Sequence, residues 1–154
     1  MKKSLCLKKP FFFGIRDPEE AEMRFVEEKK AKIVAPGRID RMDDDLSFIG
    51  LQRSNVSDHV LAIIVDIDVL DPACAPGTGI LRAGGFTVRQ VLHIIRKLCK
   101  LPFAIKIGEI CEVIPEKGNR LRPPGDKRPD PCGLTVLAAE AILREMIHRM
   151  QPQS

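Results

Sequence analysis

Apolar residues along the chain fall into short runs that predict β-strands at Phe11–Ile15, Ala31–Ala35, Val60–Val65 and Ala104–Cys111. Val60–Val65 is an uninterrupted apolar run, a pattern typical of a strand buried on both faces. Between residues 36 and 59 the periodicity is weak. There we expect only a short helix around Ile39–Ile49, which contains a solvated acidic turn at residues 43–45.

The acidic segment after the first run predicts a helix that separates the first two strands. Asp17 is expected to cap this helix, with Pro18 at its first position. Met23 and Val26 are three residues apart and are expected to face the core. Strand, helix and strand in this order predict a βαβ unit.

Apolar residues at intervals of three and four predict two further helices, at Thr87–Lys100 and Thr135–Arg149. Thr87 and Gln90 have the spacing of a capping box. The positions expected to be buried are Val88, Val91, Leu92, Ile95 and Leu98 on the first helix, and Val136, Ala139, Ile142, Leu143, Met146 and Ile147 on the second. The alternation of strands and helices predicts an α/β fold with a mostly parallel sheet, and we expect residues 1–154 to form one domain.

Composition excludes several classes of function. A net charge of +4 is too small to indicate nucleic-acid binding, and with seven Phe but no Trp or Tyr the chain lacks stacking platforms for single strands. The five cysteines include no CxxC pair, which favours reduced thiols and a cytoplasmic protein. No apolar stretch is long enough to cross a membrane.

Two carboxylates at the end of the third run are the strongest candidates for chemistry. Asp66 and Asp68 are two residues apart, so on a strand they would share a face at its carboxyl end. A divalent cation would relieve their repulsion, and carboxylate oxygens favour hard ions. The alternative is that they cap the following loop. Asp71 precedes Pro72 and is expected to have that structural role.

The residues around this pair carry a family resemblance. DIDVLDPACAPGTG at residues 66–79, followed by Gly84–Gly85 and Thr87, resembles the signature of the ureohydrolase family, which includes arginases and agmatinases. ICEVIP at residues 110–115, DPCGLT at residues 130–135 and GIR at residues 14–16 are similar to further family segments. The match covers nearly the whole chain, and corresponds to the C-terminal half of a ureohydrolase.

The resemblance implies a three-layer αβα fold, arginase-like but truncated, with a site for two Mn²⁺ ions. In the family the metals activate a water that attacks a guanidinium carbon and releases urea. Asp66 would bridge both metals and Asp68 would bind one, while Glu112 would pair with the guanidinium group of a substrate such as agmatine or arginine. No role is assigned to Glu109.

The family's other ligands come from GGDHS-like and DAHxD-like segments, which the sequence lacks. His59 cannot replace them, because a strand would hold it about 23 Å from the site. With two of the family's six protein ligands, we expect little or no hydrolase activity from the chain alone. Ile80, Arg82 and Ile114 also depart from the family pattern and leave the substrate open.

Two other interpretations remain. One is a non-catalytic protein that keeps the scaffold and pairs with a full-length relative, since an open sheet edge favours association. The other is a basic module that binds acidic partners through Arg120, Arg122, Lys127 and Arg128. Neighbouring prolines and acids dilute this charge, so the basic module is the weakest of the three hypotheses.

Overall fold

The computed structural model describes residues 10–34, 60–101, 104–114 and 133–150. The chain divides into two units, Met1–Asp43 and Asp44–Ser154, which we describe separately. The helix expected around residues 39–49, the acidic turn within it, His59 and the basic residues at 120–128 lie outside the described residues.

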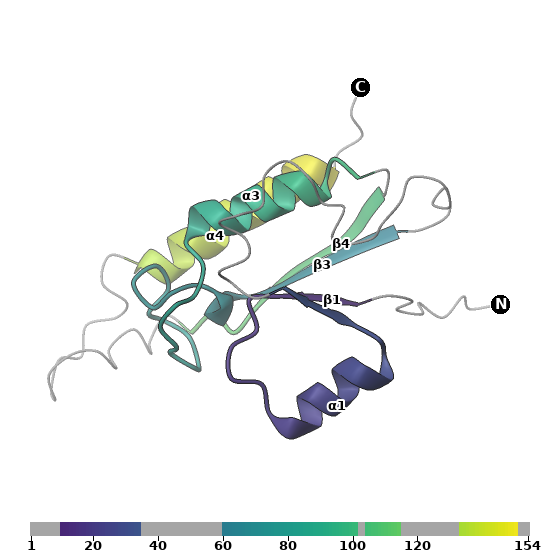
Figure 1. Ribbon diagram of the computed structural model, residues 1–154. Coiled ribbons are helices and arrows are strands. Elements are labelled where there is room, and N and C mark those ends of the chain that lie inside the picture. Colours follow the sequence, from purple (N-terminus) through teal and green to yellow (C-terminus); the bar gives the residue numbers. More distant parts are fainter. Residues whose placement is uncertain (1–9, 35–59, 102–103, 115–132, 151–154) are drawn as a thin grey trace, which may run out of the picture. The chain divides into compact units, whose positions relative to one another are not determined.

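The first unit contains the expected βαβ arrangement (Figure 1). Strand β1 (Phe11–Phe13) pairs in parallel with β2 (Lys32–Val34), and helix α1 (Glu20–Glu28) connects them. Phe11 lies opposite Lys32 in this register. The two strands are shorter than predicted, but their order and the parallel pairing confirm the βαβ prediction.

Helix α1 begins later than predicted, so the assignment of Asp17 as its cap was wrong. Asp17 has a φ of 48°, in the left-handed region, and the N-cap is Glu19. The Glu19 amide donates to Glu22 Oε2 at 2.8 Å, which satisfies a donor that the helix start leaves unpaired. Pro18 therefore precedes the helix. Val26 is buried as expected, whereas Met23 is half-buried.

The second unit is built on a parallel pair of strands, β3 (Val60–Asp66) and β4 (Ala104–Cys111). Val60 lies opposite Ala104 and Asp66 opposite Cys111, with one irregularity between Leu61 and Ala62. Strand β4 has the predicted bounds, and β3 is one residue longer than predicted. All strand pairs among the described residues are parallel, as expected.

The prediction that β3 is buried on both faces was wrong. Ile63 and Val65 are buried, but Ile64 is 61% exposed, and Val60 and Ile107 are also exposed. In Figure 1 the helices α3 (Val88–Leu98) and α4 (Leu134–Met150) lie together on one face of the strand pair. Because side chains alternate along a strand, the other face presents apolar residues that these helices do not cover.

Helix α3 follows the sequence prediction closely. Thr87 is its N-cap, and the capping box with Gln90 is present: the Thr87 amide donates to Gln90 Oε1 at 2.8 Å. Val91, Ile95 and Leu98 are buried as predicted, and Ile94 joins them. The remaining expected positions, Val88 and Leu92, are half-buried.

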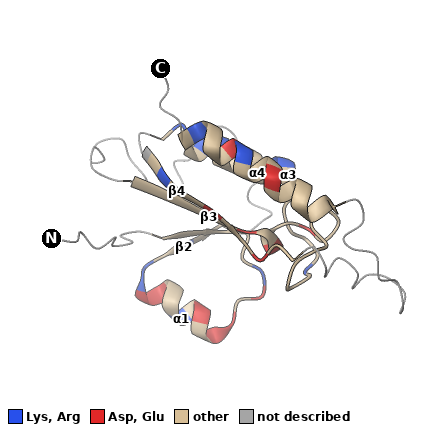
Figure 2. Cartoon of the chain, turned by 180° about the vertical axis from the view of Figure 1, so that it is seen from behind, with Lys and Arg blue, Asp and Glu red and all other residues tan. Residues whose placement is uncertain are grey.

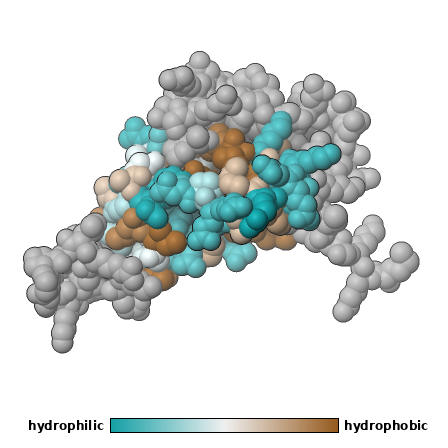
Figure 3. Space-filling model, turned by 60° about the horizontal axis from the view of Figure 1, so that its bottom comes forward, coloured by the Kyte–Doolittle hydropathy of each residue, from teal (hydrophilic) through white to brown (hydrophobic). Residues whose placement is uncertain are grey.

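Helix α4 buries only part of the predicted stripe. Ile142 and Met146 are buried as expected, and Thr135 and Ala138 are buried with them. Three positions expected in the core, Val136, Leu143 and Ile147, are exposed instead. The helix has apolar residues on two sides. Met146 packs closely on β4 at Gly108, where a Cβ would lie 3.4 Å from Met146 Sδ. Figure 3, in which the bottom of the Figure 1 view comes forward, shows hydrophobic residues exposed among hydrophilic ones on that side. No described helix has the length and hydropathy needed to span a bilayer.

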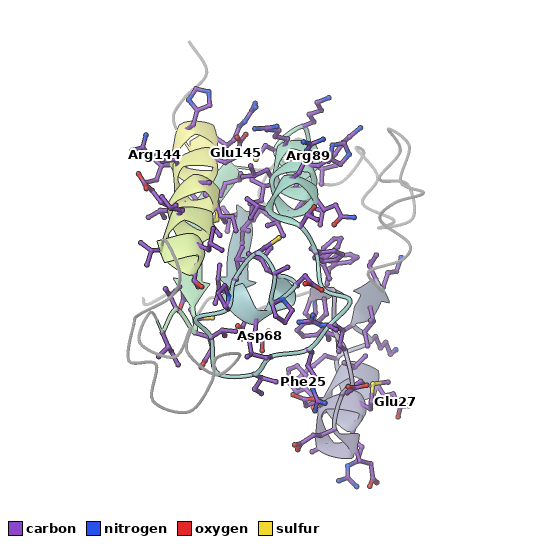
Figure 4. The ribbon with its side chains drawn as sticks, turned by 90° about the vertical axis from the view of Figure 1, so that its left-hand side faces the viewer. Phe25, Glu27, Asp68, Arg89, Arg144 and Glu145 are labelled. Atoms are coloured by element: carbon purple, nitrogen blue, oxygen red, sulfur yellow. The ribbon has the colours of Figure 1, made fainter. Side chains whose placement is uncertain are left out.

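An ionic contact joins α3 to α4. Glu145 accepts from Arg96 Nη2 at 2.9 Å through Oε2 and from Arg149 Nε at 3.0 Å through Oε1. Figure 4 shows Glu145 on the side of α4 nearer α3, with Arg144 on the opposite side. The hydrogen bond from Arg96 is the main reason why the pKa of Glu145 lies below its usual value.

This lowered pKa predicts a pH-dependent contribution to stability. The stabilisation is complete above the carboxyl's unfolded pKa of about 4.3 and is lost as the pH falls through the lower folded pKa. Because the Arg96 side chain is 50% exposed, solvent screening limits the effect. We expect Glu145→Gln to lower the free energy of unfolding by up to about 1 kcal/mol at pH 7 and to have little effect near pH 2.

Urea denaturation at the two pH values measures this difference. Glu140→Gln is the matched control, since Glu140 also pairs with an arginine on α4 but both partners are more exposed. An equal loss of stability at both pH values in Glu145→Gln would contradict the ionic explanation.

Candidate functional site

The register of β3 and β4 brings three of the candidate residues to one edge of the strand pair. Asp66 ends β3 and lies opposite Cys111, which ends β4. Asp68 and Glu112 follow these two residues directly along the chain. Because the strands are parallel, all of these groups are at the carboxyl end, where open α/β sheets bind ligands.

The chain leaves β3 at Asp66 and enters a 3-10 turn, η3 (Ile67–Val69). Asp66 caps this turn, with Oδ1 accepting from the Asp68 amide at 3.1 Å. Asp68 is therefore not on the strand, and the inference that the pair shares a strand face was wrong. The loop-capping alternative is correct for Asp66, although the cap also fixes its carboxylate beside the turn that carries Asp68 (Figure 4).

Asp71 has the structural role expected of it. Its Oδ1 accepts from the Ala73 amide at 3.0 Å and its Oδ2 from the Gly84 amide at 2.9 Å. The Asp71 amide also donates to the Phe86 carbonyl at 2.8 Å. Both carboxylate oxygens thus hold the two ends of the loop together, which leaves Asp66 and Asp68 as the candidate ligands on this segment.

Gly77, in the PGTG segment at residues 76–79, is hydrogen-bonded to two other parts of the chain. The Gly77 amide donates to Thr135 Oγ1 at 2.7 Å, and the Gly77 carbonyl accepts from the Ile114 amide at 2.7 Å. A Cβ at Gly77 would lie 2.9 Å from both the Ile114 carbonyl oxygen and Thr135 Oγ1. Glycine is therefore required there for space.

Thr135 is a site residue that sequence reasoning missed. It was predicted only as the start of the last helix, yet it is fully buried and bonded to a loop 58 residues away. Its place in the DPCGLT segment was the available signal. Thr78, in the same loop, is 2% exposed, and its hydroxyl has no hydrogen-bond partner among the described residues.

Glu112 has an unusual backbone conformation. Its φ is 60°, in the left-handed region that residues with a Cβ rarely adopt. Its carboxylate reaches back to the PGTG loop, because a Cβ at Gly79 would lie 3.0 Å from Glu112 Oε2. The carboxylate thus lies beside the loop that follows Asp66 and Asp68 along the chain.

The strand ends form an acidic environment around Cys111, whose thiol donates to the Val65 carbonyl at 3.8 Å. Burial is the main cause that raises the pKa of this thiol, and four neighbouring carboxylates raise it further: Asp66, Glu109, Glu112 and Asp68. Figure 2 shows acidic residues in red at the end of β3 and in the turn after it. The thiol stays protonated at neutral pH, and the cluster favours a cationic ligand.

The donor chemistry fits a hard divalent ion only in part. Asp66 and Asp68 offer carboxylate oxygens, which such ions prefer. Within the described part of the chain, however, no group of three or more His, Cys, Asp or Glu side chains could hold a metal ion. His93 and His148 are exposed on α3 and α4. A complete metal site therefore needs ligands beyond these two.

Comparisons with known proteins identify the family of the chain. The arginase family model matches residues 1–149. The agmatinase of Bacillus subtilis is 29% identical over 137 residues, which cover 89% of this chain and 41% of that protein. The agmatinase of Photorhabdus laumondii is 34% identical over 109 residues, covering 71% of this chain and 30% of the relative.

A solved structure shares the fold. The proclavaminate amidino hydrolase of Streptomyces clavuligerus has a TM-score of 0.66 and 27% identity, with 91% of this chain and 42% of that chain covered. The chain thus spans less than half the length of these relatives, and its α/β architecture is that of a truncated arginase-like fold. The matched residues and the shared fold together show that the chain belongs to the arginase family.

Proposed function

We propose that the chain is part of a metal-dependent ureohydrolase that removes urea from a guanidino compound, with agmatine favoured and arginine as the other candidate. The observation that carries this proposal is the register of β3 and β4. That register gathers Asp66, Asp68 and Glu112 at one carboxyl edge. Family membership supports hydrolysis of a guanidino group, and the agmatinases among the relatives favour agmatine.

Asp66 and Asp68 are the proposed metal ligands in this chain. Family membership implies a binuclear metal centre. We infer that the metal is Mn²⁺ and that Asp66 and Asp68 would hold it. When bound, such ions would lower the pKa of water far enough to supply a nucleophile at neutral pH. The cap on Asp66 supports this role, because it holds one carboxylate oxygen in place and limits rotation of the group.

Glu112 is the proposed partner of the substrate's guanidinium group. A carboxylate can accept two parallel hydrogen bonds from a planar guanidinium, which fixes the orientation of the cation. The position of Glu112 supports this role, because its carboxylate lies beside the PGTG loop: a Cβ on Gly79 would be 3.0 Å from Glu112 Oε2.

The second candidate function is a non-catalytic scaffold that pairs with a full-length relative. The apolar residues exposed on one face of β3 and β4, Val60, Ile64 and Ile107, favour it. Association through this sheet, a single-domain organisation of residues 1–154 and a cytoplasmic location all stay predictions.

Urea release and Mn²⁺ binding by the full chain test the proposal. With agmatine or arginine and added Mn²⁺, we expect turnover at or near background, because two carboxylates form an incomplete site. Mn²⁺ should still bind weakly, and the Asp66→Asn, Asp68→Asn double variant should lose that binding. Electron paramagnetic resonance of free Mn²⁺ measures the bound fraction. Glu140→Gln is the control, because it removes one carboxylate charge, as each Asp→Asn change does, but lies on α4.

The outcomes separate the two candidate functions. Mn²⁺ binding that depends on Asp66 and Asp68 supports the hydrolase-derived site. Binding that is the same in the double variant would contradict it and favour the scaffold. Robust urea release that is abolished by Asp66→Ala would instead contradict the expectation that this chain alone is incomplete.

A further inference from the structure

Thr135 connects the start of α4 to the strand end that carries Glu112. Its hydroxyl accepts from the Gly77 amide at 2.7 Å, and the carbonyl of the same glycine accepts from the Ile114 amide at 2.7 Å. Gly77 makes both hydrogen bonds, so a displacement of Gly77 would disturb its bonds to Thr135 and to Ile114. Thr135 is fully buried, which excludes water as a substitute partner for Gly77.

The Ile114 amide lies two residues after Glu112, whose backbone is in the left-handed region. Such a conformation is unfavourable for a residue with a Cβ and persists only when its surroundings hold it. The bond to Gly77 holds the chain directly after Glu112. The Glu112 carboxylate lies beside the same loop, since a Cβ on Gly79 would be 3.0 Å from Glu112 Oε2.

We propose that Thr135 is a positioning residue for Glu112. Its hydroxyl fixes Gly77, Gly77 fixes the Ile114 amide, and this connection keeps Glu112 in the backbone conformation that directs its carboxylate to the guanidinium group. The inference rests on the proposed function only in its last step, the binding of guanidinium by Glu112.

The first experiment needs no substrate. Amide hydrogen exchange of Gly77 and Ile114, together with the backbone ¹³C chemical shifts of Glu112, is measured by NMR on the full chain and on Thr135→Val and Thr135→Ser. Valine has the shape of threonine without its acceptor oxygen, so we expect both amides to exchange at least about tenfold faster and the Glu112 shifts to leave the left-handed range. Serine keeps the oxygen and should stay close to the wild type.

Thr78→Val is the matched control, because Thr78 is a buried threonine of the same loop whose hydroxyl has no partner among the described residues. It should leave the exchange of both amides unchanged. If Thr135→Val behaves like Thr78→Val, the inference is wrong. If Thr135→Val fails to fold, Thr135→Ser is used for the test. The inference is also wrong if the Glu112 shifts of Thr135→Ser leave the left-handed range although the hydroxyl is retained.

The second experiment is a titration with agmatine, followed on the same NMR signals. We expect binding by the wild type that Glu112→Gln weakens, that Thr135→Val weakens by about tenfold or more, and that Thr135→Ser restores. If agmatine binding depends on Glu112 but is unchanged in Thr135→Val, only the positioning role of Thr135 is wrong. Absence of any Glu112-dependent binding overturns the proposed function, and the positioning role with it.

Discussion

Replacing Ile142 with alanine should lower the free energy of unfolding by about 2–5 kcal/mol. Ile142 is fully buried on the face of α4 turned to the strand pair, between Ala138 and Met146. Truncation removes apolar atoms from the core and leaves a cavity that two small or unbranched neighbours fill poorly. Urea denaturation followed by circular dichroism measures the change.

The adjacent Leu143→Ala variant is the matched control, because it removes a similar volume from a side chain that is 42% exposed. Its expected cost is within about 0.5 kcal/mol. The sequence pattern favoured both residues for the core, so this pair distinguishes the stripe observed in the structure from the one predicted. Similar losses in the two variants would show that α4 packs with a different face.

Replacing Gly77 with alanine should cost about 1–3 kcal/mol and disturb the candidate site at the same time. The new Cβ would lie 2.9 Å from the Ile114 carbonyl oxygen and from Thr135 Oγ1. The former is a backbone atom that follows Glu112 and the latter belongs to a fully buried side chain, so neither can move away cheaply. The Gly77 hydrogen bonds to both elements should weaken.

Gly108→Ala controls for the entropic effect of replacing glycine, since its Cβ would meet side-chain atoms of Met146 and Met150 at 3.4 Å or more, the nearest being the two thioether sulfurs. Those flexible side chains can adjust, and we expect a change within about 0.5 kcal/mol. Thermal unfolding measures both variants. If Gly77→Ala is as stable as Gly108→Ala, the close packing of the PGTG loop against Ile114 and Thr135 is not a constraint on the fold.

Local patterns predicted much of the secondary structure because their causes are local. The capping box of Thr87 and Gln90 lies within one helical turn, and the strand Ala104–Cys111 is a contiguous segment, so both predictions were correct. The prediction that Asp17 caps α1 was wrong, because in the folded chain Asp17 lies in a left-handed turn and Glu19 is the N-cap.

Burial depends on contacts that the sequence does not record. The apolar residues of β3 were compatible with two covered faces, but α3 and α4 lie on one, and Ile64 is exposed on the other. Helix α4 has two apolar sides, and the buried one contains Ala138, Ile142 and Met146, the last of which packs on β4 at Gly108. In both cases the elements that pack against a face determine whether its apolar residues are buried.

For the candidate site, the sequence by itself determined the residue types and the family, because the ordered motif from Asp66 to Gly79 and the ICEVIP segment are contiguous in the chain. Only the tertiary structure decided that Asp68 lies on a 3-10 turn, that Glu112 has a left-handed backbone, and that Thr135 holds Gly77. The reason is physical: a motif specifies side-chain chemistry, whereas the position of each carboxylate depends on hydrogen bonds between segments up to 58 residues apart, which exist only in the folded chain.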